Sequence, residues 1–326
     1  MSLLEIDDLR ITVGNRVLVD GVSLRVEAGE AVGVAGESGS GKTLTVQTAL
    51  GFLPGGAKAT GEVRLDGVDV LTMKGESLRA IRGGTVAMVF QDPMTSLHPM
   101  LTIGTQLTEH MRTHLKLSRK AAESRAVEML ELVRIPDARG ALSAYPHRFS
   151  GGMRQRIAIA SALACEPRLL IADEITTALD VTVQAGILEL LERLRVENDM
   201  AIVAITHDLG VMNVVSERLY VMYAGRVAEH GTTRDVLDRT RHPYSKALLD
   251  ALPEAGRTGQ PLIPIPGEPA TPDKRPAGCA FHTRCAFAQE SCRTVVPPRI
   301  VIEPGHDIAC PPDPFAPDRV LLEERV

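Results

Sequence analysis

The feature that most constrains the fold of this chain is a glycine-rich loop, residues 36–43, with the sequence GESGSGKT. The loop meets every fixed position of the phosphate-binding pattern G-x-x-x-x-G-K-[ST]. The apolar run at 31–35 predicts a short buried strand before the loop, and the residues from Thr43 onward predict a helix with an apolar stripe. A glycine-rich turn can match this pattern by chance, but the flanking strand and helix favour a domain that binds a nucleoside triphosphate.

The residue types of the loop suit phosphate binding. Glycine adopts backbone conformations that are closed to other residues, so successive N–H groups can point at phosphate oxygens. Lys42 supplies a positive charge for the outer phosphates, next to the positive end of the helix dipole. The hydroxyl of Thr43 can enter the coordination shell of Mg²⁺. The predicted nucleotide-binding residues of the loop are Gly36, Ser38, Gly39, Ser40, Gly41, Lys42 and Thr43.

The charge and composition argue against several classes of protein. A net charge of -5 does not indicate a nucleic-acid partner, and an aromatic content of 3% without tryptophan argues against a base-stacking surface. The sequence contains no apolar run near the ~20 residues that span a bilayer, and its first residues lack the pattern of a signal peptide. We therefore expect a cytoplasmic chain whose membrane role, if it has one, comes through a partner subunit.

Residue periodicity indicates an α/β core with a helical insert. Alternating polar and apolar residues at 9–13 and 22–26 predict antiparallel strands ahead of the loop, and residues 61–67 add another strand ending in an Asp-Gly turn. The segment 93–149 predicts a mostly helical insert, in which Ser118 caps one helix. The insert interrupts the α/β core rather than following it.

The second half of the chain predicts a return to the core and then an extension. Short apolar runs at 169–172 and 201–205, separated by an amphipathic helix from about 180 to 197, predict a parallel βαβ unit. Beyond these elements prolines become frequent and periodicity is lost. We therefore expect an α/β fold of the P-loop type, with a mixed sheet and a helical subdomain, over residues 1–252. An irregular, cysteine-containing extension is expected over 253–326.

Five further motifs follow the nucleotide loop in the chain. They are Gln91 after an apolar strand, FSGGMRQR at 149–156, LLIADE at 169–174, TALD at 177–180, and His207 after another apolar strand. Taken singly, they have ordinary interpretations: a polar surface residue, helix caps, turn-forming carboxylates and a structural histidine. Their order, however, resembles that of the ABC-type ATPases, whose Q-loop, signature, Walker B, D-loop and switch-histidine motifs they match.

The resemblance implies a role for each residue. Asp173 would hold Mg²⁺ through water, with Thr43 and Gln91 as the other magnesium residues. The implied catalytic residues are Glu174, which would orient or deprotonate the attacking water, together with Gln91 and the γ-phosphate contact His207. In this family the signature of one subunit closes over ATP held by another, so two ATP molecules lie between two subunits. The resemblance adds Ser150, Gly151, Gly152, Asp173 and Asp180 to the nucleotide-contacting residues.

Two positions depart from the family pattern. Ile175 follows Glu174 where the family usually has proline, which implies a less rigid backbone but no lost chemical group. Val13 occupies the expected place of an aromatic residue that stacks on adenine. Because such stacking contributes ~1–3 kcal/mol per base, we expect weaker discrimination between bases.

The C-terminal part narrows the resemblance. Residues 242–249, HPYSKALL, resemble the segment that marks the peptide and nickel importer branch of the family. Three interpretations of the cysteines that follow stay open: disulfides, which a reducing cytoplasm disfavours; zinc, although no C-x2-C pair occurs; and a [4Fe-4S] cluster, which the resemblance implies. The cysteines concerned are Cys279, Cys285, Cys292 and Cys310. Cys165 stands apart and is expected to be a buried thiol inside the helix after the signature.

Together these observations predict an ATP-hydrolysing subunit that powers import of di- or oligopeptides. The implied partners are two membrane-spanning permease subunits, a second ATPase subunit, for which the resemblance favours a different chain, and an extracytoplasmic solute-binding protein. The implied location is the cytoplasmic face of the inner membrane. A nickel or other small-solute importer is the nearest alternative, followed by a soluble ABC ATPase acting on nucleic acid or ribosomes, and by an exporter. The sequence does not name the solute.

Overall fold

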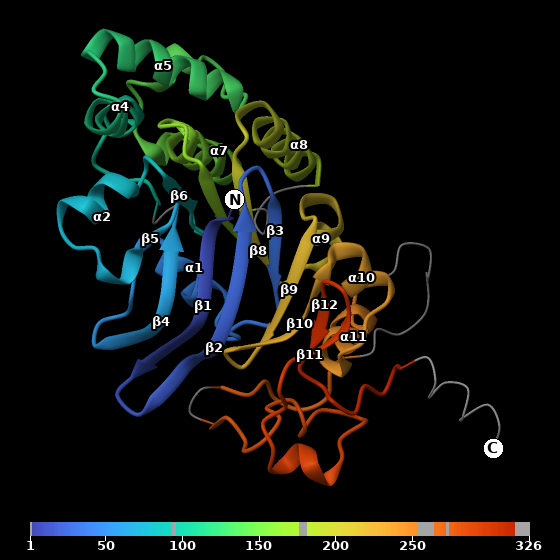
Figure 1. Ribbon diagram of the computed structural model, residues 1–326. Helices are drawn as coiled ribbons and strands as arrows, with labels where there is room; N and C mark the ends of the chain where they lie inside the picture. Colours follow the sequence, from blue (N-terminus) through green and yellow to red (C-terminus); the bar gives the residue numbers. More distant parts are fainter. Residues whose placement is uncertain (1, 93–95, 176–180, 253–263, 272–273, 317–326) are drawn as a thin grey trace.

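The computed structural model describes residues 2–92, 96–175, 181–252, 264–271 and 274–316, which form two β-sheets with helices around them (Figure 1). The smaller sheet has the order β2-β1-β4-β5. Its strands are β1 (Ser2–Val13), β2 (Arg16–Glu27), β4 (Ala57–Leu65) and β5 (Val68–Asp69). They are antiparallel, as the alternating sequence predicts, and residues 66–67 form the predicted Asp-Gly turn with positive φ at both positions.

The larger sheet has the order β11-β12-β10-β9-β3-β8-β7-β6. Its strands are β3 (Ala31–Ala35), β6 (Val86–Val89), β7 (Leu169–Asp173), β8 (Ala201–Thr206), β9 (Arg218–Tyr223), β10 (Arg226–Thr232), β11 (Ile300–Glu303) and β12 (His306–Ile308). The strands from β9 through β3, β8 and β7 to β6 are parallel neighbours. Since parallel strands end at the same edge, the segments after β3, β6, β7 and β8 meet there.

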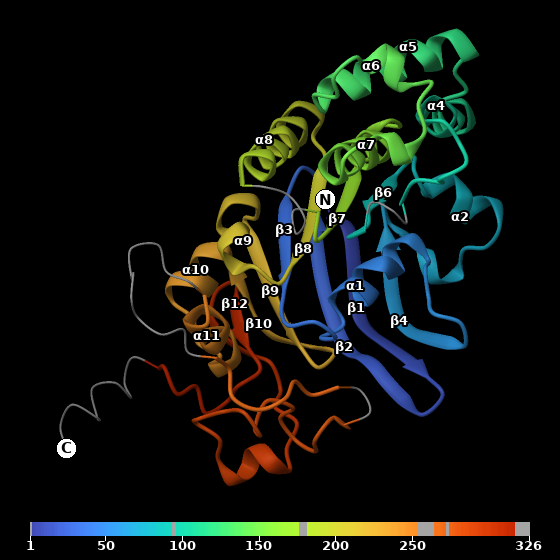
Figure 2. The same cartoon turned by 180° about the vertical axis from the view of Figure 1, so that it is seen from behind.

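A helical group lies at the end of the molecule opposite the C-terminal extension, in both views (Figures 1 and 2). It contains α4 (Ile103–His114), α5 (Arg119–Leu132), α6 (Ala138–Ala141), the 3-10 turn η3 (Pro146–Arg148), α7 (Gly151–Leu163) and α8 (Val181–Asn198). Ser118 caps α5 as predicted, since its hydroxyl accepts the Ala121 N–H. The apolar faces of α4, α5, α7 and α8 share one buried cluster with the sheet residues Ala87, Leu170 and Ile202.

The other described helices lie outside the helical group. They are α1 (Lys42–Gln47), η1 (Thr48–Leu50), η2 (Val70–Thr72), α2 (Glu76–Ile81), α9 (Leu209–Val215), α10 (Thr233–Asp238), α11 (Pro243–Asp250) and η5 (Glu290–Arg293). The last of them, η5, is in the C-terminal extension (Figure 1). A second apolar cluster joins the two sheets, with Leu4 and Ile6 on one side and Val34 and Val203 on the other. A third joins β9 and β10 to α9, α10 and α11, and it includes Phe281 from the C-terminal extension.

The C-terminal extension contributes more regular structure than its composition indicates. Its described residues are largely irregular, as expected, but β12 pairs with β10 and β11 pairs with β12, so the extension forms one edge of the larger sheet. Strands as short as β11 and β12 give too few residues for a period-two pattern to be recognised. No helix in the described ranges is long and apolar enough to cross a membrane.

Candidate nucleotide site

The glycine-rich loop connects β3 to α1, as the sequence predicts, and its glycines are required by geometry. Gly36, Gly39 and Gly41 have φ values of 143°, 79° and 96°, in the region that other residues rarely adopt. A Cβ atom on Gly36 would also lie 2.2 Å from the carbonyl oxygen of Met222, on the neighbouring strand β9. The loop is held against β9's end by a hydrogen bond of 2.8 Å from the Gly225 N–H to the Ser40 carbonyl.

Lys42 is enclosed by the loop in which it lies. Its Nζ atom donates to the carbonyl oxygens of Gly36, at 2.7 Å, and of Glu37, at 2.9 Å. Burial lowers the pKa of Lys42 below its usual value, although the charges of Glu174, Asp173 and Glu37 act in the opposite direction. The ammonium group is therefore held by two carbonyl oxygens of the loop, in the field of the carboxylates at the end of β7.

Thr43 and Asp173 bring a hydroxyl and a carboxylate together. The Thr43 Oγ1 atom donates to Oδ1 of Asp173 at 3.1 Å, which joins the start of α1 to the end of β7. Burial raises the pKa of Asp173, while the hydrogen bond from Thr43 lowers it. Hard oxygen ligands of this kind suit Mg²⁺. The buried hydroxyl of Ser40 has no hydrogen-bond partner among the described residues, so this part of the loop can still take a polar ligand.

Glu174 lies between Gln91 and His207. Gln91 Nε2 donates to one carboxylate oxygen of Glu174 at 2.5 Å, and His207 Nδ1 lies 2.9 Å from the other. These residues follow β6, β7 and β8, so the parallel sheet alone explains why they meet. Glu174 has a left-handed φ of 46°, which costs a non-glycine residue ~1–3 kcal/mol and is typical of functional positions. Its N–H group bonds to the Ile205 carbonyl at 2.9 Å, which holds this conformation in place.

The signature segment lies apart from this cluster. Ser150 caps α7 by accepting the Met153 N–H at 3.3 Å, and its carbonyl accepts the Arg154 N–H, so the described hydrogen bonds of Ser150 stay within its own helix. Ser150 and Gly151 are exposed, and a Cβ on Gly151 would meet no atom within 4 Å. Gly152 is half-buried. Asp180 and the rest of the segment 177–180 lie outside the described residues.

The two positions that depart from the family pattern, Ile175 and Val13, lie in the described part of the structure. Ile175 is 6% exposed and packs in the apolar cluster beneath the helical group, so apolar packing fixes the residue where the family usually has proline. Val13 is the last residue of β1 and is half-buried.

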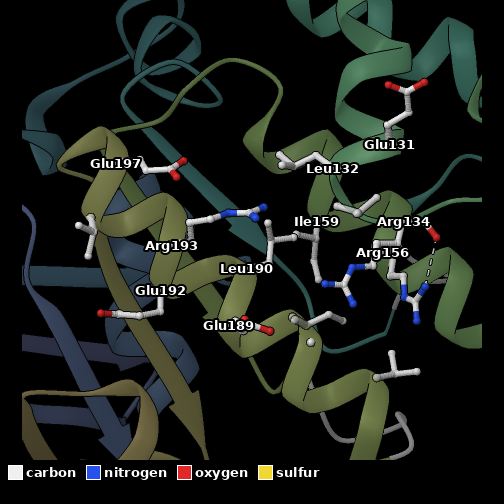
Figure 3. A pocket seen from close by; sticks show the side chains of 15 residues that line it. Glu131, Leu132, Arg134, Arg156, Ile159, Glu189, Leu190, Glu192, Arg193 and Glu197 are labelled. Carbon is white, nitrogen blue, oxygen red and sulfur yellow. Dashed lines mark hydrogen bonds between the residues drawn. The ribbon is translucent and has the colours of Figure 1, made fainter.

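A large cavity of about 820 Å³ lies between α7, α8 and the end of α5, away from this chemistry (Figure 3). Its walls alternate basic and acidic side chains, such as Arg156, Glu189 and Arg193, and Arg156 donates to the Arg134 carbonyl across it. None of the predicted site residues lines this cavity. We therefore place the functional site at the nucleotide loop, where the convergent polar groups are, rather than at the larger space.

The four cysteines of the extension line a single cavity of about 120 Å³, together with His242 and His282. All four are free thiols. Burial raises the pKa of Cys310 to about 12, and the other three thiols add to the effect. Within the described residues, no three histidine, cysteine or acidic side chains are arranged to hold a metal ion. Cys165 is buried as expected, but it follows the end of α7 instead of lying inside it, and burial raises its pKa.

One set of contacts at the loop has no counterpart in the sequence motifs. The Glu37 N–H donates to Tyr244 Oη at 2.8 Å, and Arg284 makes two hydrogen bonds to the Glu37 carboxylate, at 2.6 and 2.9 Å. Glu37 occupies a variable position of the phosphate-binding pattern, and the partners lie more than 200 residues away in the chain. In the sequence, Tyr244 belongs to the 242–249 segment that resembles the importer branch, whereas Arg284 belongs to no recognised motif.

Comparison with known proteins identifies the family of the chain. The ABC transporter family model matches residues 19–177, and the model of the oligopeptide/dipeptide transporter C-terminal region matches residues 228–292. The oligopeptide transport ATP-binding protein OppD of Salmonella typhimurium is 44% identical over 98% of this chain and 95% of its own. The dipeptide transport ATP-binding protein DppD of Bacillus subtilis is 45% identical over 95% of this chain and 94% of its own.

The fold has solved relatives as well. The bacterial ABC transporter cassette MJ0796, solved as a dimer, has a TM-score of 0.64 and 28% identity, covering 71% of this chain and 99% of that one. The fold and site are those of a P-loop ATPase. The chain therefore belongs to the ABC transporter ATP-binding family, in its oligopeptide and dipeptide branch.

Proposed function

We propose that this chain is the ATP-hydrolysing subunit that powers import of di- or oligopeptides through a membrane ABC transporter. The observation that carries the proposal is that one chain has both the oligopeptide/dipeptide C-terminal region and the contacts Thr43–Asp173, Gln91–Glu174 and His207–Glu174. Relatives named as oligopeptide and dipeptide transport ATP-binding proteins are 44% and 45% identical to this chain over nearly their full length.

The nucleotide loop is the proposed ATP site. The loop N–H groups and Lys42 would bind the outer phosphates, with Ser40 and Ser38 as further polar groups on the loop. Thr43 and Asp173, already 3.1 Å apart, would hold Mg²⁺ with Gln91. When bound, that ion neutralises charge on the phosphate oxygens.

Glu174 is the proposed base. Its carboxylate would orient the attacking water and accept its proton, and the positioning contacts from Gln91 and His207 fix both carboxylate oxygens. His207 would also reach the γ-phosphate. Because each contact comes from the end of a different strand, a shift of any one strand end would change the direction in which Glu174 points.

A second ATPase subunit is proposed to complete the site. Ser150, Gly151 and Gly152 make no described contact with the nucleotide loop of their own chain, and Ser150 and Gly151 are free to meet another surface. They would close over ATP held by the partner, with Asp180 at the same interface. Closure around two ATP molecules, and reopening after hydrolysis, would bias the conformation of the permeases. We propose that the second ATPase is a different chain.

The remaining proposed partners are two membrane-spanning permease subunits and an extracytoplasmic solute-binding protein. The chain would then act at the cytoplasmic face of the inner membrane. The proposed domain division is an ATPase domain at 1–252, with a helical subdomain at about 93–149, and a transporter-type extension at 253–326.

The four cysteines are proposed to hold a [4Fe-4S] cluster, with zinc as the alternative. Four thiols that share one cavity fit a soft cation, because thiolates are the ligands such metals prefer. Binding would need these side chains to converge more closely than they do in the structure. The bound group would cross-link a proline-rich extension that has little core of its own.

Uptake by cells tests the proposed function. A strain lacking this chain should lose uptake of a labelled tripeptide and regain it with the intact chain, but not with Lys42→Ala, which removes the phosphate-binding charge. Labelled Ni²⁺ uptake should be the same in all these strains. Loss of Ni²⁺ uptake with normal tripeptide uptake would overturn the proposal in favour of a metal importer.

A further inference from the structure

The C-terminal extension reaches the nucleotide loop through Glu37. Three parts of this residue are held: its N–H by Tyr244, its carboxylate by Arg284, and its carbonyl oxygen by Lys42. One of the three partners, Arg284, belongs to the C-terminal extension, and Tyr244 lies in α11 at the end of the ATPase domain. The conformation of the loop next to Gly36 therefore depends on residues outside the phosphate-binding motif.

Arg284 is buried beside Glu37 and is held there by several contacts. Its side chain is 3% exposed, its Nε atom donates to the Pro266 carbonyl at 2.8 Å, and its guanidinium lies 5.9 Å from the ring centres of both Tyr223 and Phe281. Burial acts to lower the pKa of Arg284, but its bonds to Glu37 and Tyr223 raise it above the usual value. A buried bidentate pair of this kind fixes both orientation and charge.

Tyr244 is equally confined. It is fully buried in the first turn of α11, where His242 Nδ1 accepts its N–H at 3.0 Å. Its ring packs on Tyr223, with centroids 4.5 Å apart, and against Phe281 from the extension. The hydroxyl is therefore presented to the Glu37 N–H by a rigid aromatic group.

From these contacts we infer that Arg284 and Tyr244 are positioning residues for ATP binding, which makes the C-terminal extension a structural part of the nucleotide site. Arg284 neutralises the Glu37 carboxylate in the phosphate-binding loop, which would otherwise repel a triphosphate. Tyr244 fixes the Gly36–Glu37 peptide, whose carbonyl oxygen, that of Gly36, accepts a hydrogen bond from Lys42. The inference concerns ATP binding by the chain itself, so it stands or falls separately from the transported solute.

The test is the dissociation constant for ATP of the full chain, measured by competition with a fluorescent nucleotide. We expect Arg284→Met to raise it about tenfold, equivalent to ~1.4 kcal/mol. The matched control is Arg293→Met in the same extension, since Arg293 is exposed and pairs with Glu290. The control should bind ATP as the unchanged chain does.

Two measurements separate this role from a general structural one. In the double variant Arg284→Met with Glu37→Gln, most of the lost affinity should return, because a neutral residue 37 needs no counter-charge. The effect of Arg284→Met should also shrink as salt rises from about 0.05 to 0.5 M, since screening weakens repulsion between Glu37 and ATP. Unchanged ATP affinity in a folded Arg284→Met chain, or no recovery with Glu37→Gln, would overturn the inference.

Tyr244→Phe keeps the test available if Arg284→Met fails to fold. This change keeps the packed ring and removes only the hydroxyl that accepts the Glu37 N–H. We expect a severalfold weaker ATP affinity at an unchanged melting temperature. An affinity equal to that of the unchanged chain would refute the positioning role of Tyr244.

Discussion

Replacing Gly36 by alanine should remove ATP binding with little change in the rest of the fold. The size of the effect on loop stability follows from the structure. The backbone φ of 143° costs an alanine ~1–3 kcal/mol. The new Cβ would lie 2.2 Å from the Met222 carbonyl oxygen, a backbone atom that cannot rotate away, and such overpacking typically costs a further ~1–3 kcal/mol. We therefore expect the variant to lose about 2–6 kcal/mol of loop stability, by the sum of these two costs.

Gly39→Ala is the matched control. Its φ of 79° imposes a similar backbone cost, but a Cβ there would meet no atom within 4 Å. Denaturant unfolding and ATP titration of both variants would measure the difference, which should be ~1–3 kcal/mol in stability and a much larger loss of ATP affinity for Gly36→Ala. Equal effects of the two substitutions would refute the claim that contact between the loop and β9 shapes the site.

Further predictions concern other parts of the chain. Burial acts to raise the pKa of Asp307, but its bonds to His230 and Arg299 lower the pKa overall. The Asp307 carboxylate therefore stabilises the fold above its unfolded-state pKa, and this stabilisation is lost as the pH falls through its folded-state pKa. Asp307→Asn should flatten the acid limb of the curve of unfolding free energy against pH, and an unchanged acid limb would count against stabilisation by Asp307. Val13→Tyr should tighten ATP binding by ~1–3 kcal/mol, measured by competitive binding, whereas no gain would show that position 13 does not face the base. Anaerobically purified chain should be brown with about four irons, and colourless protein with stoichiometric zinc would overturn the cluster.

The features that the sequence predicts best are those that depend on residues close together in the chain. The loop's glycines, the Ser118 cap and the strand before Asp173 are each determined by local conformation, and the structure has all of them as expected. To predict that Gln91, Glu174 and His207 meet, the order of the parallel strands must also be known. The apolar runs indicate parallel strands but do not determine their order. Their roles rest on resemblance and stay predictions.

The contacts that sequence reasoning missed join distant segments. Arg284 and Glu37 are 247 positions apart, and a single arginine beside Cys285 carries no periodic signal. The strands β11 and β12 were missed because tertiary pairing stabilises them rather than local propensity: β12 pairs with β10, and β11 pairs with β12. The contacts of the signature segment could not be predicted for another reason, because the surface that it is proposed to meet belongs to another subunit.

The most direct test of the account is the behaviour of Glu174→Gln. The amide keeps the size of the side chain and cannot accept the proton of the attacking water, so hydrolysis should fall by ~10²–10⁴-fold. ATP binding should remain, and ATP should drive stable pairing with the second ATPase subunit, measured by light scattering. Glu123→Gln, an exposed change on α5, is the control and should hydrolyse ATP normally. Near-normal turnover by Glu174→Gln would contradict the assignment of Glu174 as the base.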